Sequence, residues 1–244
     1  MHRRRFISTA FPSTPGDILR VVIGLLSLFA ITTTQAQISG SATVVSDYRF
    51  RGVSLSQGNP EAQVNIGYDN PNGMYAGGFA SGVDLNGVDA EQFIAYGGYT
   101  SRLPSGLSWE AGVTSAVYSG ISHLNYSEAF AGLTSDNYSA RIYYSPRYLD
   151  QNTSTLYAEL NAAYTLEEDW RLLAHVGLLH PLSDSNIGSS ELVSRYDGRL
   201  AINARIADWN AQLAWVVLQE KSTLYPQYQD RNPRAVILSV SYSF

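Results

Sequence analysis

The residue types best suited to chemistry are few in this chain and lie far apart. Histidine occurs at four positions, His2, His123, His175 and His180, and cysteine is absent. None of the histidines belongs to an H-E-x-x-H or similar metal-binding pattern. Without cysteine, a thiol nucleophile, a Cys-based zinc site and a disulfide scaffold are all excluded. We therefore expect neither a metal centre nor a cofactor.

A lipid hydrolase built on a Ser-His pair is the first enzymatic alternative. Ser122 is next to His123, and Ser183 follows His180 by three residues. A His-x-Ser sequence, which would place both side chains on one face of a strand, does not occur. Catalytic groups are also assembled from distant segments, so this alternative stays open.

Paired acids are the second enzymatic alternative, because Asp84, Asp89 and Asp150 lie near the predicted ends of strands. A protease would need two such carboxylates close together. Charges of both signs are otherwise dispersed along the chain, which is typical of a lining surface. We expect that the protein is not an enzyme.

The composition is that of an all-β chain. Charged residues make up only 15% of the sequence, whereas Tyr contributes 17 residues and Gly 20. Lysine occurs once, at Lys221. After removal of residues 1–36 the chain holds 12 basic and 20 acidic residues, a net charge of −8. A nucleic-acid partner is not expected, since binding phosphates needs a concentrated basic surface.

The first 36 residues have the features of an export signal. A basic start at 2–5 precedes an apolar run at 21–31, and Thr34-Gln35-Ala36 supplies small residues for cleavage before Gln37. The apolar run is about half the roughly 20 residues that a spanning helix needs. We predict a cleaved signal peptide at 1–36 and one outer-membrane β-barrel at 37–244.

Period-two alternation of apolar and polar residues dominates the rest of the chain. This period predicts β-strands, and the segments end at turn residues. We count twelve predicted strands, an even number, at 40–50, 61–69, 74–84, 91–100, 107–118, 127–135, 138–147, 154–165, 170–180, 196–207, 210–220 and 234–244.

The connections between these strands alternate in length. The short ones are 70–73, 104–106, 136–137, 167–170 and 207–210, and the long ones are 51–60, 85–90, 119–126, 148–153, 181–195 and 221–233. Short turns at one end and long loops at the other are typical of a transmembrane up-and-down β-barrel, with short periplasmic turns and longer extracellular loops.

The last predicted strand separates two faces clearly. One face carries Val236, Leu238, Val240, Tyr242 and Phe244, and the other is mostly small and polar. Periodicity alone does not say which face is outward. Aromatic residues beside the short connections favour an apolar outside, as in the belt of a membrane protein: Tyr75, Trp109, Tyr164, Trp170, Trp209 and Tyr242.

The chain ends at an aromatic residue inside its last alternating strand. Phe244 in this place resembles the C-terminal assembly signal of bacterial outer-membrane barrels. We therefore expect the barrel-assembly machinery to be a partner through this strand. The outer-membrane lipids of a Gram-negative cell are the second expected partner, because a closed barrel leaves no unpaired edge in lipid.

The segment SDYRFRGVSLSQGNPEAQVNIGYDNPNGMYAGGFASGVD, residues 46–84, resembles the N-terminal signature of the TorF family of proposed porins. The residues that carry the likeness are Ser46-Asp47-Tyr48, Arg51-Gly52-Val53-Ser54, Pro60, Gln63, Tyr68, Gly73, Tyr75-Ala76-Gly77 and Ser81 to Asp84. The resemblance implies an outer-membrane location and a channel role. It implies no substrate and no catalytic residue.

We predict a porin-like channel for passive diffusion of ions or small solutes, with a structural or binding barrel that does not conduct as the main alternative. Tyr48 and Phe50 are expected to face lipid, and 51–60 to be the first extracellular loop. The expected pore-lining residues are Asp47, Arg49, Arg51, Asp69, Asp84, Glu110, Arg141, Arg147, Glu159, Arg171, Arg199 and Arg205. These acids and bases either pair and partly plug the lumen or line a water-filled path.

Overall fold

The computed structural model describes residues 37–85, 87–150, 153–182, 194–219 and 232–244. The predicted signal peptide, 1–36, lies outside the described residues. Among the helices of the described part, none is long and apolar enough to cross a membrane.

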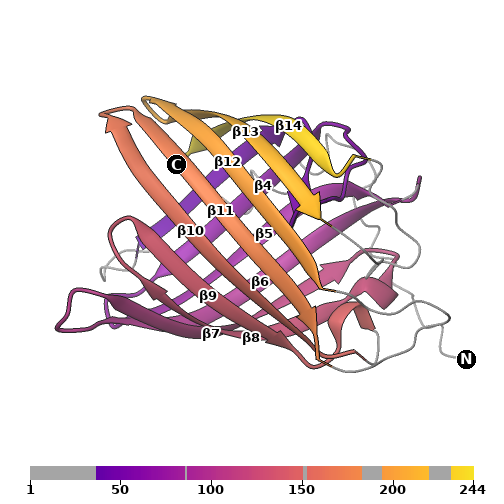
Figure 1. The fold of residues 1–244 in the computed structure, drawn as a ribbon, viewed down its shortest axis with the longest axis horizontal. Helices are drawn as coiled ribbons and strands as arrows, with labels where there is room; N and C mark the ends of the chain where they lie inside the picture. Colours follow the sequence, from indigo (N-terminus) through magenta and orange to yellow (C-terminus); the bar gives the residue numbers. More distant parts are fainter. Residues whose placement is uncertain (1–36, 86, 151–152, 183–193, 220–231) are drawn as a thin grey trace, which may run out of the picture. The chain divides into compact units, whose positions relative to one another are not determined.

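Antiparallel strands close into a barrel, in which each strand pairs with the next along the chain and β1 pairs with β14 (Figure 1). Ser41 of β1 lies opposite Ser243 of β14 at this seam. The twelve strands are β1 (Gln37–Val45), β4 (Glu61–Asp69), β5 (Met74–Asp84), β6 (Asp89–Arg102), β7 (Ser108–Tyr118), β8 (Tyr126–Thr134), β9 (Tyr138–Ser145), β10 (Thr155–Glu167), β11 (Trp170–Pro181), β12 (Arg195–Ile206), β13 (Trp209–Gln219) and β14 (Arg234–Ser243). The predicted fold class is confirmed.

The short and long connections lie at opposite ends of the barrel, as predicted. Gln37 of β1 is opposite Asp69 of β4, so the start of β1, the end of the chain and the short turns share one end. The short 3-10 helices η1 (Ser122–Leu124) and η2 (Tyr148–Asp150) belong to long connections at the other end (Figure 1).

The outer surface of the barrel is apolar. Apolar side chains are highly exposed even on strands that are paired on both sides. The exposed fractions are 63% for Val113, 59% for Leu160, 58% for Val176 and 67% for Val236. Such exposure is unfavourable in water and favourable in lipid. The structure therefore gives the predicted sign to the alternation, with the apolar face outside.

The predicted aromatic belt is partly confirmed. Trp109 packs against Tyr99 with ring centroids 5.7 Å apart, and Trp209 against Tyr242 at 5.1 Å, all near the short turns. Tyr75 is the exception, since its hydroxyl donates a hydrogen bond to Glu110 inside the barrel. Tyr75 stands one position after Met74, so it has the opposite parity and points to the lumen.

The segment after β1 corrects the predicted first strand. β1 ends at Val45, and Ser46 closes the ladder, with its backbone N–H donating to the carbonyl oxygen of Leu238 at 2.9 Å and its hydroxyl accepting from the Leu238 N–H at 3.0 Å. The chain then turns into the lumen and forms a hairpin of β2 (Arg49–Phe50) and β3 (Val53–Ser54). Tyr48 and Phe50 therefore do not face lipid, and 51–60 does not begin as an outer loop.

Candidate functional site

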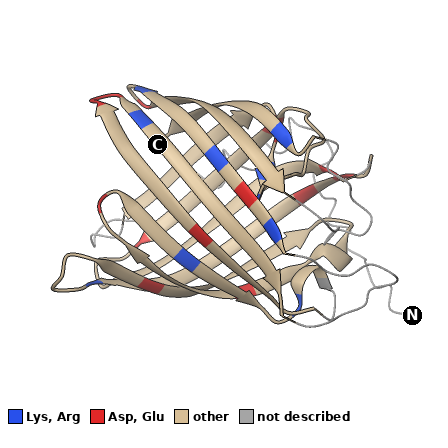
Figure 2. Cartoon of the chain, viewed as in Figure 1, with Lys and Arg blue, Asp and Glu red and all other residues tan. Residues whose placement is uncertain are grey.

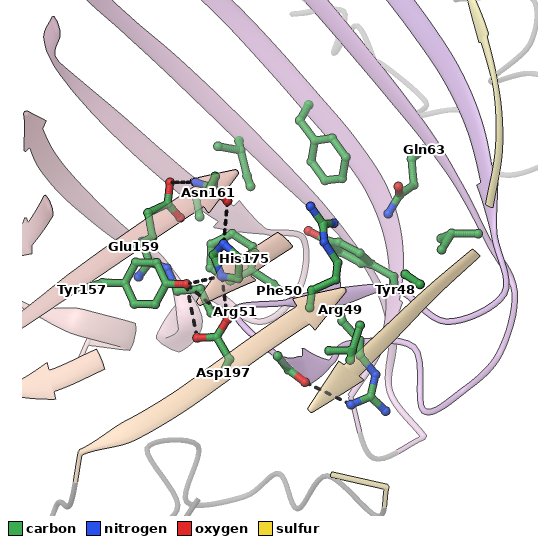
Figure 3. A pocket seen from close by; sticks show the side chains of 18 of the residues that line it. Tyr48, Arg49, Phe50, Arg51, Gln63, Tyr157, Glu159, Asn161, His175 and Asp197 are labelled. Carbon is green, nitrogen blue, oxygen red and sulfur yellow. Dashed lines mark hydrogen bonds and ion pairs between the residues drawn. The ribbon is translucent and has the colours of Figure 1, made fainter. Parts of the chain in front are cut away.

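The lumen of the barrel contains a cavity of about 750 Å³. Side chains from all twelve barrel strands line it, together with residues 47–52 of the hairpin. Figure 3 shows the hairpin residues projecting into this space from one side and the side chains of β10, β11 and β12 meeting them. A volume of this size accommodates a small solute.

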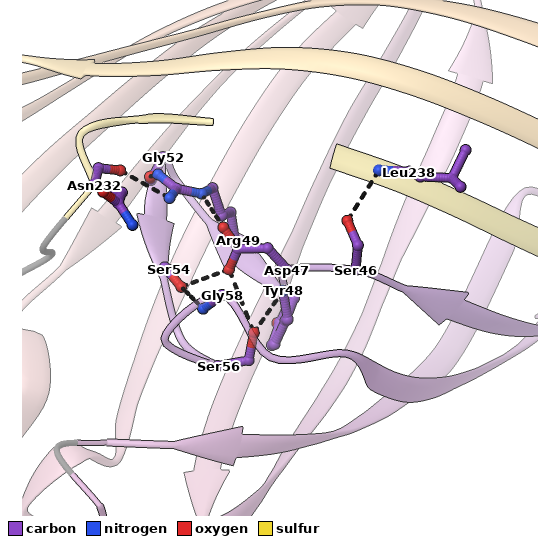
Figure 4. Close-up of polar contacts among 10 residues, drawn as sticks. All are labelled: Ser46, Asp47, Tyr48, Arg49, Gly52, Ser54, Ser56, Gly58, Asn232 and Leu238. Atoms are coloured by element: carbon purple, nitrogen blue, oxygen red, sulfur yellow. Dashed lines mark hydrogen bonds and ion pairs between the residues drawn. The ribbon is translucent and has the colours of Figure 1, made fainter. Parts of the chain in front are cut away.

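Asp47 holds the hairpin in its inward conformation (Figure 4). Its carboxylate accepts hydrogen bonds from the hydroxyls of Ser54 at 2.5 Å and Ser56 at 3.3 Å, and forms an ion pair with Arg49 Nε at 2.6 Å. The Ser56 hydroxyl in turn accepts the backbone N–H of Tyr48 at 2.9 Å. A buried carboxylate is stable only with such partners, so these contacts fold the segment on itself.

The turn of the hairpin needs an unusual backbone. Arg51 and Gly52 have φ values of 50° and 81°, the two positive angles of a type I′ turn. A Cβ atom on Gly52 would lie 2.7 Å from Cβ of Asp197 and 3.0 Å from a methyl of Leu218. The hairpin tip therefore rests directly against the inner wall at β12 and β13.

Arg51 anchors the tip to a third part of the wall. Its guanidinium donates two parallel hydrogen bonds to the Glu128 carboxylate, at 2.8 and 2.6 Å, and the two side chains are only 6% and 2% exposed. The same guanidinium lies over the ring of Tyr157, 4.0 Å from its centroid, and 5.1 Å from those of Phe50 and Tyr143. This is a nearly completely buried ion pair inside an aromatic cage.

Tyr48 fixes the base of the hairpin to the wall at β5 and β6. Its ring packs on Phe79 of β5 with centroids 5.6 Å apart, and its hydroxyl donates to Gln92 at 2.5 Å. Gln92 donates to Tyr118 at 2.6 Å. Burial, reinforced by the Tyr118 phenol, raises the pKa of the Tyr48 hydroxyl well above its usual range, so this phenol stays protonated and remains a donor.

A second polar network lies beside the Arg51 cage (Figure 3). His175 Nε2 is 2.9 Å from the Asp197 carboxylate, and His175 Nδ1 is 2.7 Å from the Asn161 amide oxygen. Tyr157 donates its hydroxyl proton to Asp197 at 3.2 Å. The two ring nitrogens of His175 thus connect Asn161 of β10 with Asp197 of β12.

The network continues along the wall toward the short turns. Glu110 accepts from Arg141 Nε at 2.6 Å and from the Tyr75 hydroxyl at 2.8 Å. Arg141 also reaches the Tyr143 hydroxyl at 3.3 Å, and Tyr143 donates to Glu159 at 3.4 Å. Most of these charged side chains and hydroxyls are therefore hydrogen-bonded to one another.

Six of the twelve predicted pore-lining residues line the cavity: Asp47, Arg49, Arg51, Arg141, Glu159 and Arg199. Glu110 does not itself line the cavity, but it accepts hydrogen bonds from two residues that do, Tyr75 and Arg141. Figure 2 shows acidic and basic residues side by side on neighbouring strands of the wall.

The other five candidates lie outside this cavity. Asp69 lines a smaller recess of about 370 Å³ near Phe244. Asp84, at the end of β5, accepts hydrogen bonds from the side chain of Gln57 and the backbone of Gly87. The remaining three are exposed: Arg147 just after β9, Arg171 near the short turns, and Arg205, which is 3.6 Å from Asp169.

Sequence reasoning missed two acids that organise the lumen, Glu128 and Asp197. Glu128 shares its face with Tyr126 and Phe130, and the opposite face of β8 carries a mixture of Ser, Ala and Leu, so the strand has no clear polar side. Asp197 lies two residues before Arg199 in β12 and therefore on the same face. This spacing could have identified Asp197 as a lumenal residue from the sequence.

Of the residues of the enzymatic alternatives, Asp84 and Asp89 lie directly opposite each other in the β5–β6 ladder, and Ser122 and His123 are consecutive in η1. His180 Nδ1 is 2.8 Å from the Ser194 hydroxyl, but no described Asp or Glu hydrogen-bonds the other ring nitrogen. Ser183 lies outside the described residues, and so does the side chain of Asp150. The described residues contain no cluster of acids and histidines that would hold a metal ion.

A family model described as "Bacterial protein of unknown function (Gcw_chp)" matches residues 30–244. The chain belongs to the Gcw_chp family. No curated protein matches its sequence. The match includes the whole barrel and the inward hairpin, so both are part of what the family model spans.

Two solved porins are similar to the Gcw_chp barrel. The structure titled "KdgM porin" has a TM-score of 0.53 at 13% identity, over 84% of this chain and 99% of that chain. The "NanC porin" structure has a TM-score of 0.55 at 11% identity, again over 84% of this chain and 99% of that chain. At such identities the likeness is one of fold, and the fold is that of an outer-membrane porin.

Proposed function

We propose that this Gcw_chp protein is an outer-membrane channel for passive diffusion of ions or small solutes. The observation that carries the proposal is the polar cavity enclosed by all strands of a barrel whose outer face is apolar. The predicted signal peptide and the likeness of residues 46–84 to the TorF family support the same assignment. Phe244 and the apolar surface fit the proposed partners, the assembly machinery and outer-membrane lipid.

The inward hairpin determines how wide this channel is. It contacts Phe79 and Gln92 on one wall, Glu128 on another, and lies against Asp197 on a third. The hairpin also lies against Leu218 of β13, and Arg49 donates to the carbonyl oxygen of Asn232, just before β14, at 2.8 Å. We propose that the open path runs past these contacts, beside the hairpin. A barrel closed by the same hairpin is the second candidate, favoured by the nearly complete burial of the Arg51–Glu128 pair.

Single-channel recording in planar bilayers separates the two candidates. We expect the purified, folded wild-type barrel to give discrete current steps, smaller than those of an open sixteen-stranded porin. Folding is verified independently by the shift in gel mobility between heated and unheated samples. A preparation that is folded by this criterion and carries no current contradicts the channel and favours the closed barrel.

A further inference from the structure

The cavity has two chemically different walls. Strands β8 to β12 and the hairpin carry all the charged groups that line the cavity, and Arg49 of the hairpin reaches the carbonyl oxygen of Asn232, just before β14, at 2.8 Å. The other wall, formed by β13, β14, β1 and β4, presents only uncharged side chains: Thr43, Val45, Gln63, Gln212, Ala214, Val216, Ile237, Ser239 and Ser241. Figure 3 shows Gln63 well apart from the His175 network. One side of the cavity is therefore ionic, and the other offers hydroxyl and amide groups.

The acids of the ionic wall already have donors. Asp47 is paired with Arg49, Glu128 with Arg51, and Asp197 with His175. Within the described part of the chain, Glu159 accepts only the long hydrogen bonds from Tyr143 at 3.4 Å and from Asn161 at 3.5 Å. Among the described residues, Asp47, Glu128 and Asp197 are thus engaged with bases of this wall, and Glu159 is the acid of the wall that has no ion pair.

Arg199 is the base that stays available. It lines the cavity, its residue is exposed, and among the described residues it has no hydrogen bond or ion pair. Its neighbours across the ladder are His175 of β11 and Val216 of β13, so it stands where the ionic wall meets the uncharged one. Because it remains hydrated, a ligand does not first have to displace a protein carboxylate from it.

We infer that Arg199, with the hydroxyl and amide groups of β13 and β14, forms a binding subsite for a small monocarboxylate that carries several hydroxyls. The inference rests on the proposed channel function and names its solute class. The guanidinium binds a carboxylate through two parallel hydrogen bonds, and Gln212, Ser239 and Ser241 can bind hydroxyls of the same solute.

The charge balance of the cavity sets the preferred ligand charge. Arg199 is its one base without a protein partner among the described residues, and Glu159 is a weakly engaged acid of the same cavity. A monoanion is neutralised by Arg199, whereas a dianion would keep a net negative charge next to Glu159. The volume of about 750 Å³ is sufficient for one molecule of sugar size.

The test is block of the single-channel current by gluconate, with sorbitol as the neutral polyol and acetate as the carboxylate without hydroxyls. We expect gluconate to block at lower concentration than either. Arg199→Gln should raise the blocking constant at least tenfold, and Arg199→Lys should raise it less, since it keeps the charge and loses the bidentate geometry. Arg102→Gln is the matched control, because Arg102 is exposed at the end of β6 and does not line the cavity.

A double variant, Ser241→Ala with Gln212→Ala, tests the uncharged wall. It should weaken block of the current by gluconate and leave block by acetate unchanged. Block that is equal for gluconate and sorbitol, or unaltered by Arg199→Gln, overturns the subsite even though the channel conducts. If the wild-type barrel carries no current, the proposed channel function is contradicted, independently of the subsite. The subsite is then judged by NMR of gluconate with the detergent-solubilised barrel: binding that Arg199→Gln removes upholds it, and no binding overturns it.

Discussion

At the scale of single residues, the Arg51–Glu128 pair is the contact with the largest energetic consequence. Both side chains are almost fully buried, so each depends on the other for compensation of its charge. We predict that Arg51→Ala lowers stability by about 3–5 kcal/mol, because it leaves Glu128 as a buried, unpaired carboxylate. The measurement is the temperature at which the folded band disappears on unheated gels. Replacing both residues, as Arg51→Met with Glu128→Gln, should recover most of the loss.

The control for this prediction is the exposed pair Arg205–Asp169. Its atoms are 3.6 Å apart and its side chains are 54% and 57% exposed, so Arg205→Ala should change stability by less than about 1 kcal/mol. Equal losses of stability in Arg51→Ala and Arg205→Ala would contradict the prediction that burial makes the Arg51–Glu128 pair more stabilising than an exposed pair.

At the scale of elements, the hairpin of β2 and β3 is the feature that controls the lumen. We predict that Gly52→Ala increases single-channel conductance, since the new Cβ would lie 2.7 Å from Cβ of Asp197 and force the tip away from the wall. Gly58→Ala is matched, because Gly58 has the same φ of 81° but no atom within 4 Å of a new Cβ. Backbone strain is thus common to both variants, and only Gly52→Ala adds a clash.

The two glycine variants distinguish a narrowing hairpin from a merely structural one. A larger conductance in Gly52→Ala, together with a nearly unchanged value in Gly58→Ala, supports control by the tip. The same conductance in Gly52→Ala and wild type, in barrels that are equally folded, rules the hairpin out as the restriction.

At the scale of the whole molecule, closure of the barrel depends on the contacts between β1 and the residues at and after the end of β14. Gly40 and Phe244 exchange backbone hydrogen bonds of 2.9 and 3.0 Å, and the Phe244 ring lies over Gly40, where a Cβ would approach to 2.5 Å. We predict that Phe244→Ala reduces the yield of folded barrel in the outer membrane. Phe93→Ala is the control, since Phe93 is 51% exposed on the outer face and away from the seam.

The yield is measured as the heat-modifiable band in isolated outer membranes. Refolding of both variants in detergent separates stability from assembly. If Phe244→Ala is deficient in cells and normal in detergent, the aromatic terminus acts in assembly. A yield equal to that of Phe93→Ala contradicts the proposed role of this residue.

Much of the barrel was predictable because its pattern is local. β4 and β5 begin and end at the predicted residues, and the other strands differ by a few. Period two follows from the pleat, and the short turns follow from Gly, Pro, Asn and Asp, so neither requires knowledge of distant contacts. The one strand that was seriously wrong, predicted at 40–50, continues its alternation beyond the point where the chain leaves the ladder.

The sequence by itself determined the number of strands, their order and the end with short turns, since each is encoded within a few neighbouring residues. It favoured an apolar outside through its aromatic residues, and the exposure of the apolar face in the structure agrees with this sign. Only the tertiary structure decided that Asp47, Tyr48 and Arg51 turn inward. Alternation in a strand and in a lumenal hairpin looks the same, and the difference lies in partners such as Gln92 and Glu128 that come from β6 and β8. Those partners reach the hairpin only when the barrel has closed around it.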